Sequence, residues 1–167
     1  TNRAQFSELA KLLNDSSVDV QVALGFQLSS FPETHEAAQT LALRAGAEPL
    51  VRDAILSGLR GRELETLQAL LAKKAGNIPS IVLESLAQAV MAERRKERVK
   101  TLLEVIVSES ANSDNQVALL AGASGKVKGA KKAPTAKLLY LESIPAELEK
   151  LAASANATSK PLVSALD

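Results

Sequence analysis

The side chains that most often do chemistry in proteins are few and scattered in this chain. His35 is the only histidine and cysteine is absent, so a histidine-based triad or a zinc site lacks most of its members. Glu63 and Glu65 are two positions apart, as are Glu147 and Glu149, and in a helix this spacing turns each pair to different faces. We therefore predict no catalytic residue, no metal ligand and no cofactor site, and we expect His35 to be a solvated residue in the first turn of a helix.

A short glycine-rich segment resembles a phosphate-binding loop only superficially. Gly122 to Lys126 reads Gly-Ala-Ser-Gly-Lys, but the first glycine has the wrong spacing, and Val127 stands where a serine or threonine would bind magnesium. We instead predict an irregular basic loop over about 124–135, which is more consistent with a solvated segment than with a base-stacking one. Its cations around 126–132 have no interleaved aromatic residue; they are Lys126, Lys128, Lys131 and Lys132.

A second basic stretch lies around 94–100, between two predicted helices. It holds Arg94, Arg95, Lys96, Arg98 and Lys100. We expect Glu93 and Glu97 to neutralise part of this charge by pairing four residues along an exposed helix end. The net charge of the whole chain is +1, which gives no general attraction for nucleic acid and disfavours it as a partner. A nucleic-acid-binding module that uses residues around 94–100 and 126–132 is the alternative function.

The elements that carry these residues are predicted to be helices. Apolar residues make up 46% of the chain and aromatic residues only 2%, and a core of Leu, Ala and Val suits closely packed helices better than sheets. Helical spacing of apolar residues predicts about eight helices with short connections. Pro49 and Pro79 mark two helix starts, and Gly46 marks a helix end. The expected apolar faces include Ala37, Ala38, Leu41, Ala42 and Ala45; Leu50, Val51, Ala54, Ile55 and Leu59; Leu64, Leu67, Leu70 and Leu71; Ile81, Val82, Leu86, Ala89 and Val90; and Val99, Leu102, Leu103 and Ile106.

A repeat gives these helices a predicted arrangement. Val20-Gln21-x-Ala23-Leu24 and Val51-Arg52-x-Ala54-Ile55 stand 31 residues apart, and Val82, Ser85 and Leu86 continue the pattern. Chance recurrence of common residues is the competing interpretation. One helix pair cannot bury both of its apolar faces, so pairs stack on one another. We predict an all-α fold: an α-solenoid, or superhelix, of stacked antiparallel helix pairs in a single domain over 1–167.

The stretch from Ala47 to Leu56, with Pro49 followed by Val51-Arg52 and Ala54-Ile55, resembles a HEAT-repeat helix. Asp19 to Leu24 looks like a second copy, with Gln21 in the arginine position. The 31-residue offset is shorter than the usual period of that family, so the resemblance implies a compact HEAT- or armadillo-like variant.

The order of three segments, Asp19–Leu28, Val51–Gly61 and Gln116–Gly122, also resembles the helical-repeat region of large bacterial multidomain proteins described as membrane-bound dehydrogenases. That resemblance implies a propeller domain before the helices, a c-type haem domain after them, and an exported, periplasmic location; the sequence itself assigns no compartment. None of the haem ligands or propeller-site residues of that family has a matching position here.

These observations favour a protein that binds rather than catalyses. We expect a non-catalytic scaffold that contacts other domains of a larger parent chain or a partner protein, with no membrane span in this segment. The chain begins at Thr1 rather than methionine, which indicates a piece of a longer protein. An enzyme of the helical-repeat kind that removes lesions from DNA would need aromatic residues along its binding face, and the chain has no Trp and one Tyr.

Overall fold

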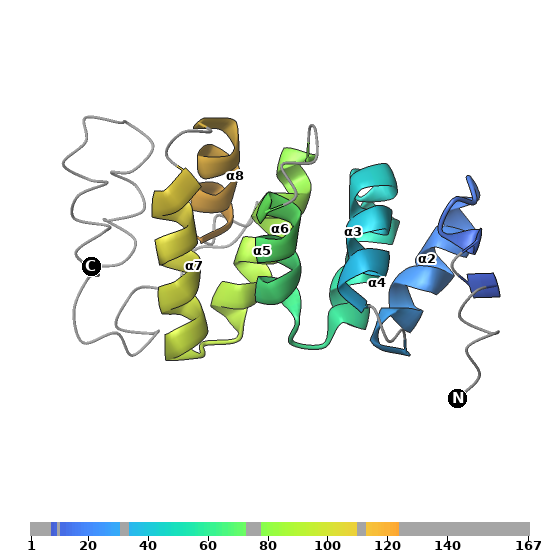
Figure 1. Cartoon of the computed structure of the whole chain (residues 1–167), viewed down its shortest axis with the longest axis horizontal. Coiled ribbons are helices and arrows are strands. Elements are labelled where there is room, and N and C mark those ends of the chain that lie inside the picture. Colours follow the sequence, from blue (N-terminus) through green and yellow to red (C-terminus); the bar gives the residue numbers. More distant parts are fainter. Residues whose placement is uncertain (1–7, 10, 31–33, 73–77, 110–112, 124–167) are drawn as a thin grey trace. The chain divides into compact units, whose positions relative to one another are not determined.

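The computed structural model in Figure 1 describes residues 8–9, 11–30, 34–72, 78–109 and 113–123. Within these ranges the regular structure is entirely helical, which confirms the predicted all-α class. The predicted basic loop over about 124–135 lies outside the described residues. The elements are α2 (Val18–Gln27), the short 3-10 helix η1 (Leu28–Ser30), α3 (Thr34–Ala45), α4 (Pro49–Leu59), α5 (Glu63–Ala72), α6 (Ser80–Ala92), α7 (Lys96–Ser108) and α8 (Ser113–Ala123).

The contacts within the chain divide it into two compact units, Thr1–Val82 and Leu83–Asp167. The first unit contains α2 to α5 and the start of α6, and the second contains the rest of α6 with α7 and α8. The single domain over 1–167 stays a prediction.

Helix boundaries fall where local chemistry places them. Pro49 occupies the first position of α4, where its missing N–H costs no hydrogen bond, after an extended Glu48. The helix ends at Arg60, which adopts the left-handed conformation with φ 49°, and Gly61 follows with φ 88°. Gly46 follows the last residue of α3, as its position in the sequence predicts.

The core is built from the predicted apolar stripes. Val51, Ala54, Ile55 and Leu59 of α4 are buried, as are the predicted α3 residues from Ala37 to Ala45. Two members of the predicted faces are wrong: Leu50 is 63% exposed and Ile81 is 37% exposed. Each precedes a fully or almost fully buried valine by one position, and one position along a helix turns the side chain by about 100°. Both therefore lie on the side of the helix that faces away from the core.

The closest helix contact of the first unit joins α2 to α4. A Cβ added at Gly25 would lie 2.7 Å from Ala54 Cβ, and a Cβ added at Gly58 would fall on the carbonyl oxygen of Gly25 and 3.2 Å from Leu28 Cβ. Both glycines are buried. At these positions the backbones of α2 and α4 lie too close together for either glycine to carry a side chain. Because residue numbers rise together in α2 and α4 along this contact, the two helices are parallel.

The second unit repeats this contact between α6 and α8. A Cβ added at Gly122 would fall on the carbonyl oxygen of Glu84 and 2.9 Å from Ala87 Cβ. In both units a glycine of the later α-helix therefore lies against a carbonyl of the α-helix before the preceding one, and its side-chain neighbour lies three residues further along the chain. In the first unit, α3 also packs against α2, α4 and α5.

A polar contact recurs at the turns between helices. The fourth residue of α2, α4 and α8 reaches back to a backbone carbonyl at the end of the preceding helix or in the turn after it. Gln21 Nε2 donates to Asp15 O at 2.8 Å, and Gln116 Nε2 donates to Ile106 O at 3.0 Å. The Arg52 guanidinium donates to Gly46 O and Ala47 O at 3.4 and 3.3 Å. Ile106 lies in the last turn of α7, whose carbonyls lack an intrahelical partner, and the other acceptors lie in the turns before α2 and α4.

The equivalence of Gln21 and Arg52 extends the sequence repeat to hydrogen bonding. Both residues reach a carbonyl six positions earlier, and they stand 31 positions apart. The fourth residue of α6 is Leu83, which is fully buried and cannot donate such a bond. The repeat is therefore complete in α2 and α4 and altered in α6.

Replacing Gly58 by alanine tests the close contact. Alanine ordinarily favours a helix over glycine by about 0.5–1 kcal/mol, but here the added methyl group would overlap the backbone of α2. We expect Gly58→Ala to lower the free energy of unfolding by about 1–3 kcal/mol, measured by urea denaturation. Ser57→Ala is the matched control, because Ser57 is an exposed neighbour in the same helix; a Gly58 variant as stable as this control would contradict the contact.

Candidate functional site

The residues with catalytic potential do not assemble in the described part of the chain. His35 lies in the first turn of α3, and its side chain is outside the described residues. No group of three or more metal-ligating side chains comes together among the described residues. Within the same ranges, every helix is too short or too polar to span a bilayer.

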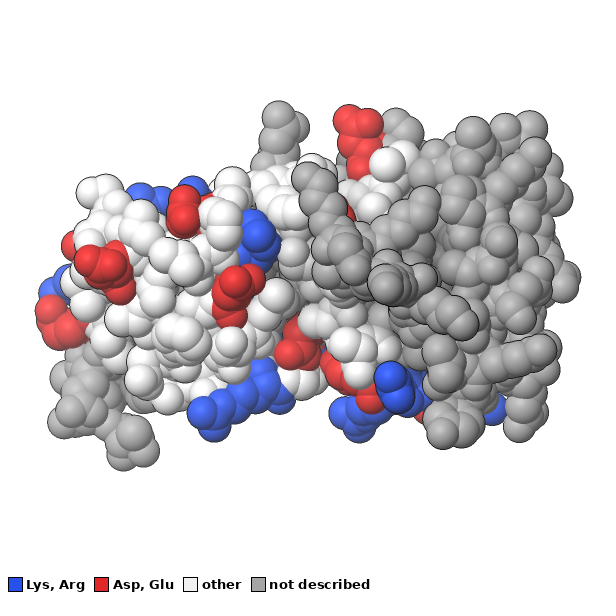
Figure 2. Space-filling view, turned by 180° about the vertical axis from the view of Figure 1, so that it is seen from behind, with Lys and Arg blue, Asp and Glu red and all other residues white. Residues whose placement is uncertain are grey.

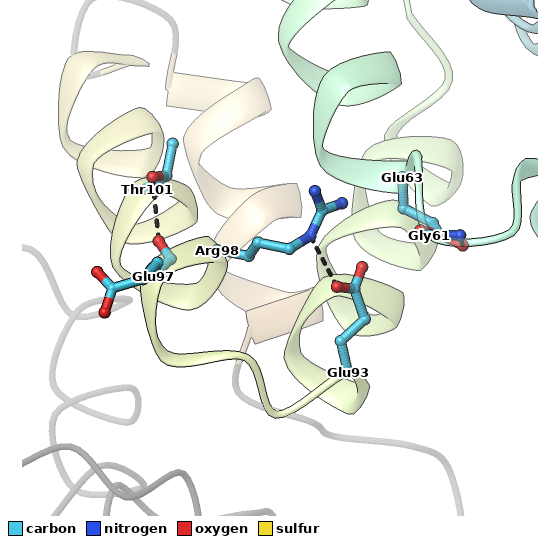
Figure 3. A network of polar contacts seen from close by, with 6 residues as sticks. All are labelled: Gly61, Glu63, Glu93, Glu97, Arg98 and Thr101. Atoms are coloured by element: carbon cyan, nitrogen blue, oxygen red, sulfur yellow. Dashed lines mark hydrogen bonds and ion pairs between the residues drawn. The ribbon is translucent and has the colours of Figure 1, made fainter.

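Glu63 has a structural environment at the start of α5. Its side chain is only 8% exposed, and its Oε1 accepts a hydrogen bond from the backbone N–H of Gly61 at 3.1 Å (Figure 3). Arg60, Gly61 and Arg62 form the link between α4 and α5, so this bond holds the entry into α5. Glu65 is half-buried two residues later. Glu63 therefore supports the turn by accepting a backbone hydrogen bond.

The basic stretch around 94–100 contains a buried ion pair. Arg98 Nε lies 2.7 Å from Glu93 Oε2, and the two side chains are 14% and 15% exposed (Figure 3). The expected pairing of Glu93 four residues along an exposed helix end is therefore wrong. The chain turns between α6 and α7, with Arg94 in the left-handed conformation at φ 54°, and this turn brings residue 98 of α7 back to residue 93. The pair thus holds the α6–α7 turn together.

The remaining cations of this stretch are exposed. Arg94, Arg95 and Lys96 lie at the surface where α7 begins, and Lys100 Nζ is 3.9 Å from Glu104 Oε1 on an exposed side of α7. Glu97 contributes its backbone carbonyl to Thr101 Oγ1 at 3.1 Å, while its side chain is exposed (Figure 3). On the face of the molecule seen from behind, Figure 2 shows both positive and negative groups among uncharged ones over the coloured residues. The predicted lysines around 126–132 lie outside the described residues.

An exposed apolar patch on α2 and α4 is the feature that sequence reasoning missed. Phe26 is 53% exposed, Val18 40% and Leu50 63%, and Val22 is half-buried. Val18, Val22 and Phe26 follow one another at intervals of four, which places them along one side of α2. This spacing is visible in the sequence, but only the structure shows that the buried Leu24 and Leu28 lie on a different side of the helix.

The packing places Leu50 of α4 on the same side as the apolar stripe of α2. α3 packs against both α2 and α4, so the sides of α2 and α4 that face away from α3 point in the same general direction. Because the helices are parallel and Gly25 lies beside Ala54, Leu50 stands at a level between Val18 and Val22. We call these four residues, Val18, Val22, Phe26 and Leu50, the α2–α4 patch. Such a set of exposed large apolar side chains is typical of a surface that binds another protein.

Comparisons with known proteins add no assignment. No family model, no curated protein and no solved structure matches the chain. The functional argument therefore depends on the chain's own residues.

The buried pair can be tested against an exposed one in the same helix. We expect Arg98→Met to lower the free energy of unfolding by about 2–3 kcal/mol, because it leaves the largely buried Glu93 carboxylate without this cation. Lys100→Met is the control, since Lys100 and Glu104 are 60% and 51% exposed, and its effect should stay within about 0.5 kcal/mol. Equal losses of unfolding free energy in urea denaturation would show that burial of the Arg98–Glu93 pair does not increase its contribution to stability.

Filter binding of a duplex DNA at about 50 and 200 mM salt tests the nucleic-acid alternative. We expect no saturable binding that weakens steeply with salt, because Arg98 is engaged with Glu93 and the other charges are of mixed sign. A dissociation constant that rises by about tenfold or more over this range, and a further loss of binding in Arg94→Ala/Arg95→Ala, would instead support the alternative.

Proposed function

We propose that the chain is a HEAT- or armadillo-like α-solenoid that acts as a non-catalytic scaffold. Its role is to hold other domains of a larger parent chain, or a partner protein, in contact with its helices. The resemblance to the helical-repeat region of bacterial membrane-bound dehydrogenases extends this proposal to a redox-related parent.

The architectural part of the proposal is supported by three recurrences. α2 and α4 are parallel neighbours, as expected when each helix of one kind is followed by an antiparallel partner and the pairs stack. The glycine-on-carbonyl contact is present in both units, at Gly58 and at Gly122. The fourth residue reaches back to a preceding carbonyl in α2, α4 and α8. A sequence built from unrelated helices has no reason to repeat these contacts.

The functional part depends on one observation, the exposure of the α2–α4 patch. An exposed phenylalanine and an exposed leucine on adjacent helices cost solvation free energy, and burial of such a side chain against a partner stabilises a complex by about 1.5–3 kcal/mol. Stacked helices offer long surfaces of this kind for binding other polypeptides. The exposed cations Arg94, Arg95 and Lys96 supply no comparable argument for nucleic acid, because acidic side chains are interspersed with them.

In-cell photocrosslinking tests the proposed function directly. The full-length parent protein would carry photoreactive p-benzoylphenylalanine in place of Leu50, which is 63% exposed, or in place of Asp114 of α8 as a polar exposed control. We expect position 50 to crosslink to one defined polypeptide or to another domain of the parent, identified by mass spectrometry and confirmed with the purified partner. Crosslinks at position 50 that match those at position 114, or that join the protein to nucleic acid, would contradict the proposal.

A further inference from the structure

We infer that the α2–α4 patch binds an amphipathic helix whose apolar stripe is flanked by lysine or arginine. This inference rests on the proposed function, because it names the chemistry of the partner that the scaffold would hold.

The shape of the patch fits a helix. Val18, Val22 and Phe26 span eight positions of α2, which corresponds to about 12 Å along the helix axis. Leu50 of the parallel helix α4 widens this stripe at the level between Val18 and Val22. Apolar side chains spaced over about two helical turns match the i, i+3 or i+4, and i+7 anchors of an amphipathic helix that lies in a groove or along a helix pair.

The charge around the patch selects a basic partner. Asp19 lies next to Val18 on α2 and Asp53 lies one turn after Leu50 on α4, and both are exposed. Within α2 and α4 the only cation is Arg52, which is half-buried and donates to Gly46 O and Ala47 O. Outside these two helices, the exposed cations among the described residues of the first unit include Arg60, which follows the end of α4, and Arg44, which bonds to Asn14 before α2. On α2 and α4 themselves, the exposed charges beside the apolar stripe are therefore both carboxylates.

Electrostatic complementarity then decides between kinds of partner. Lysine or arginine beside the apolar stripe of a partner helix would approach Asp19 and Asp53, which speeds association and disfavours partners of like charge. An acidic helix would place carboxylates against carboxylates. Serine at position 57, which donates to Asp53 O at 2.8 Å, adds no charge of its own.

The test uses two labelled synthetic peptides of about 14 residues with leucines at positions i, i+3, i+4 and i+7, one filled with lysine and one with glutamate. Binding to the purified chain is followed by fluorescence anisotropy at low and at physiological salt. The chain variants are Phe26→Ser/Leu50→Ser for the apolar stripe and Asp19→Asn/Asp53→Asn for the charges. Val117→Ser is the matched control, because Val117 is a 43% exposed valine in α8 of the second unit. Circular dichroism and urea denaturation establish that each variant is folded.

We expect the lysine peptide to bind at least about tenfold more tightly than the glutamate peptide, with weaker binding at higher salt. Phe26→Ser/Leu50→Ser should raise the dissociation constant by about tenfold or more, and Val117→Ser should leave it unchanged. Asp19→Asn/Asp53→Asn should remove most of the preference for lysine and most of the salt dependence. Equal binding of the two peptides, or equal losses in the apolar variant and in Val117→Ser, would overturn the inference.

Failure of this inference and failure of the proposed function can be told apart. A chain that binds neither peptide refutes a basic amphipathic partner, whereas a specific protein crosslink at position 50 would still support a scaffold. Absence of any specific crosslink at position 50 contradicts the scaffold, whatever the peptides do.

Discussion

Helices α2 and α4 approach so closely at Gly25 and Gly58 that neither position has room for a side chain. Glycine in a helix costs about 0.5–1 kcal/mol relative to alanine, so two glycines on facing helices are unfavourable unless the close approach returns more in packing. It does so by burying Leu24, Leu28 and Ile55 on the two sides of the contact. Two parallel neighbours also require a connecting helix that runs back between them, and α3 packs against both.

The exposed surface follows from this constraint. Once α2 and α4 are joined through their glycines and covered by α3, their remaining sides face solvent, and Phe26 and Leu50 lie there. The polar side chains that could have reached this surface are engaged elsewhere. Gln21 and Arg52 bond to carbonyls of the preceding turns. Polar groups thus fix the turns, while apolar groups remain available on the helix sides.

Much of the helical content could be predicted from the sequence, because proline, glycine and the spacing of leucine and alanine act locally. Pro49 begins α4, and α3 ends just before Gly46, as expected. Periodicity was less reliable at the edges of a stripe. Leu50 adjoins the buried Val51 in sequence, and helical spacing alone assigns both to one face, although their side chains differ by about 100° around the helix.

The candidate surface was harder to predict, for two physical reasons. The Glu93–Arg98 pair spans five residues and forms only because Arg94 takes a left-handed conformation, which no spacing rule for helices includes. The α2–α4 patch depends on which side of α2 its neighbours cover, and this is a property of packing rather than of α2 alone. Gln21 and Arg52 occupy equivalent positions of the sequence repeat. Their shared hydrogen bond to a carbonyl six positions earlier is apparent only in the three-dimensional structure.

Distances between spin labels on α2 and α4 test the parallel contact most directly, and the absence of cysteine allows clean labelling. One doubly labelled variant carries cysteines at Asp19 and Leu50, a second at Gln27 and Ser57, and a third at Asp19 and Ser57, all exposed positions. The account predicts short and similar distances for the first two pairs, as expected for helix axes about 8–10 Å apart, and a clearly longer distance for the third. Unequal distances in the first two pairs, or a shortest distance in the third, would contradict it.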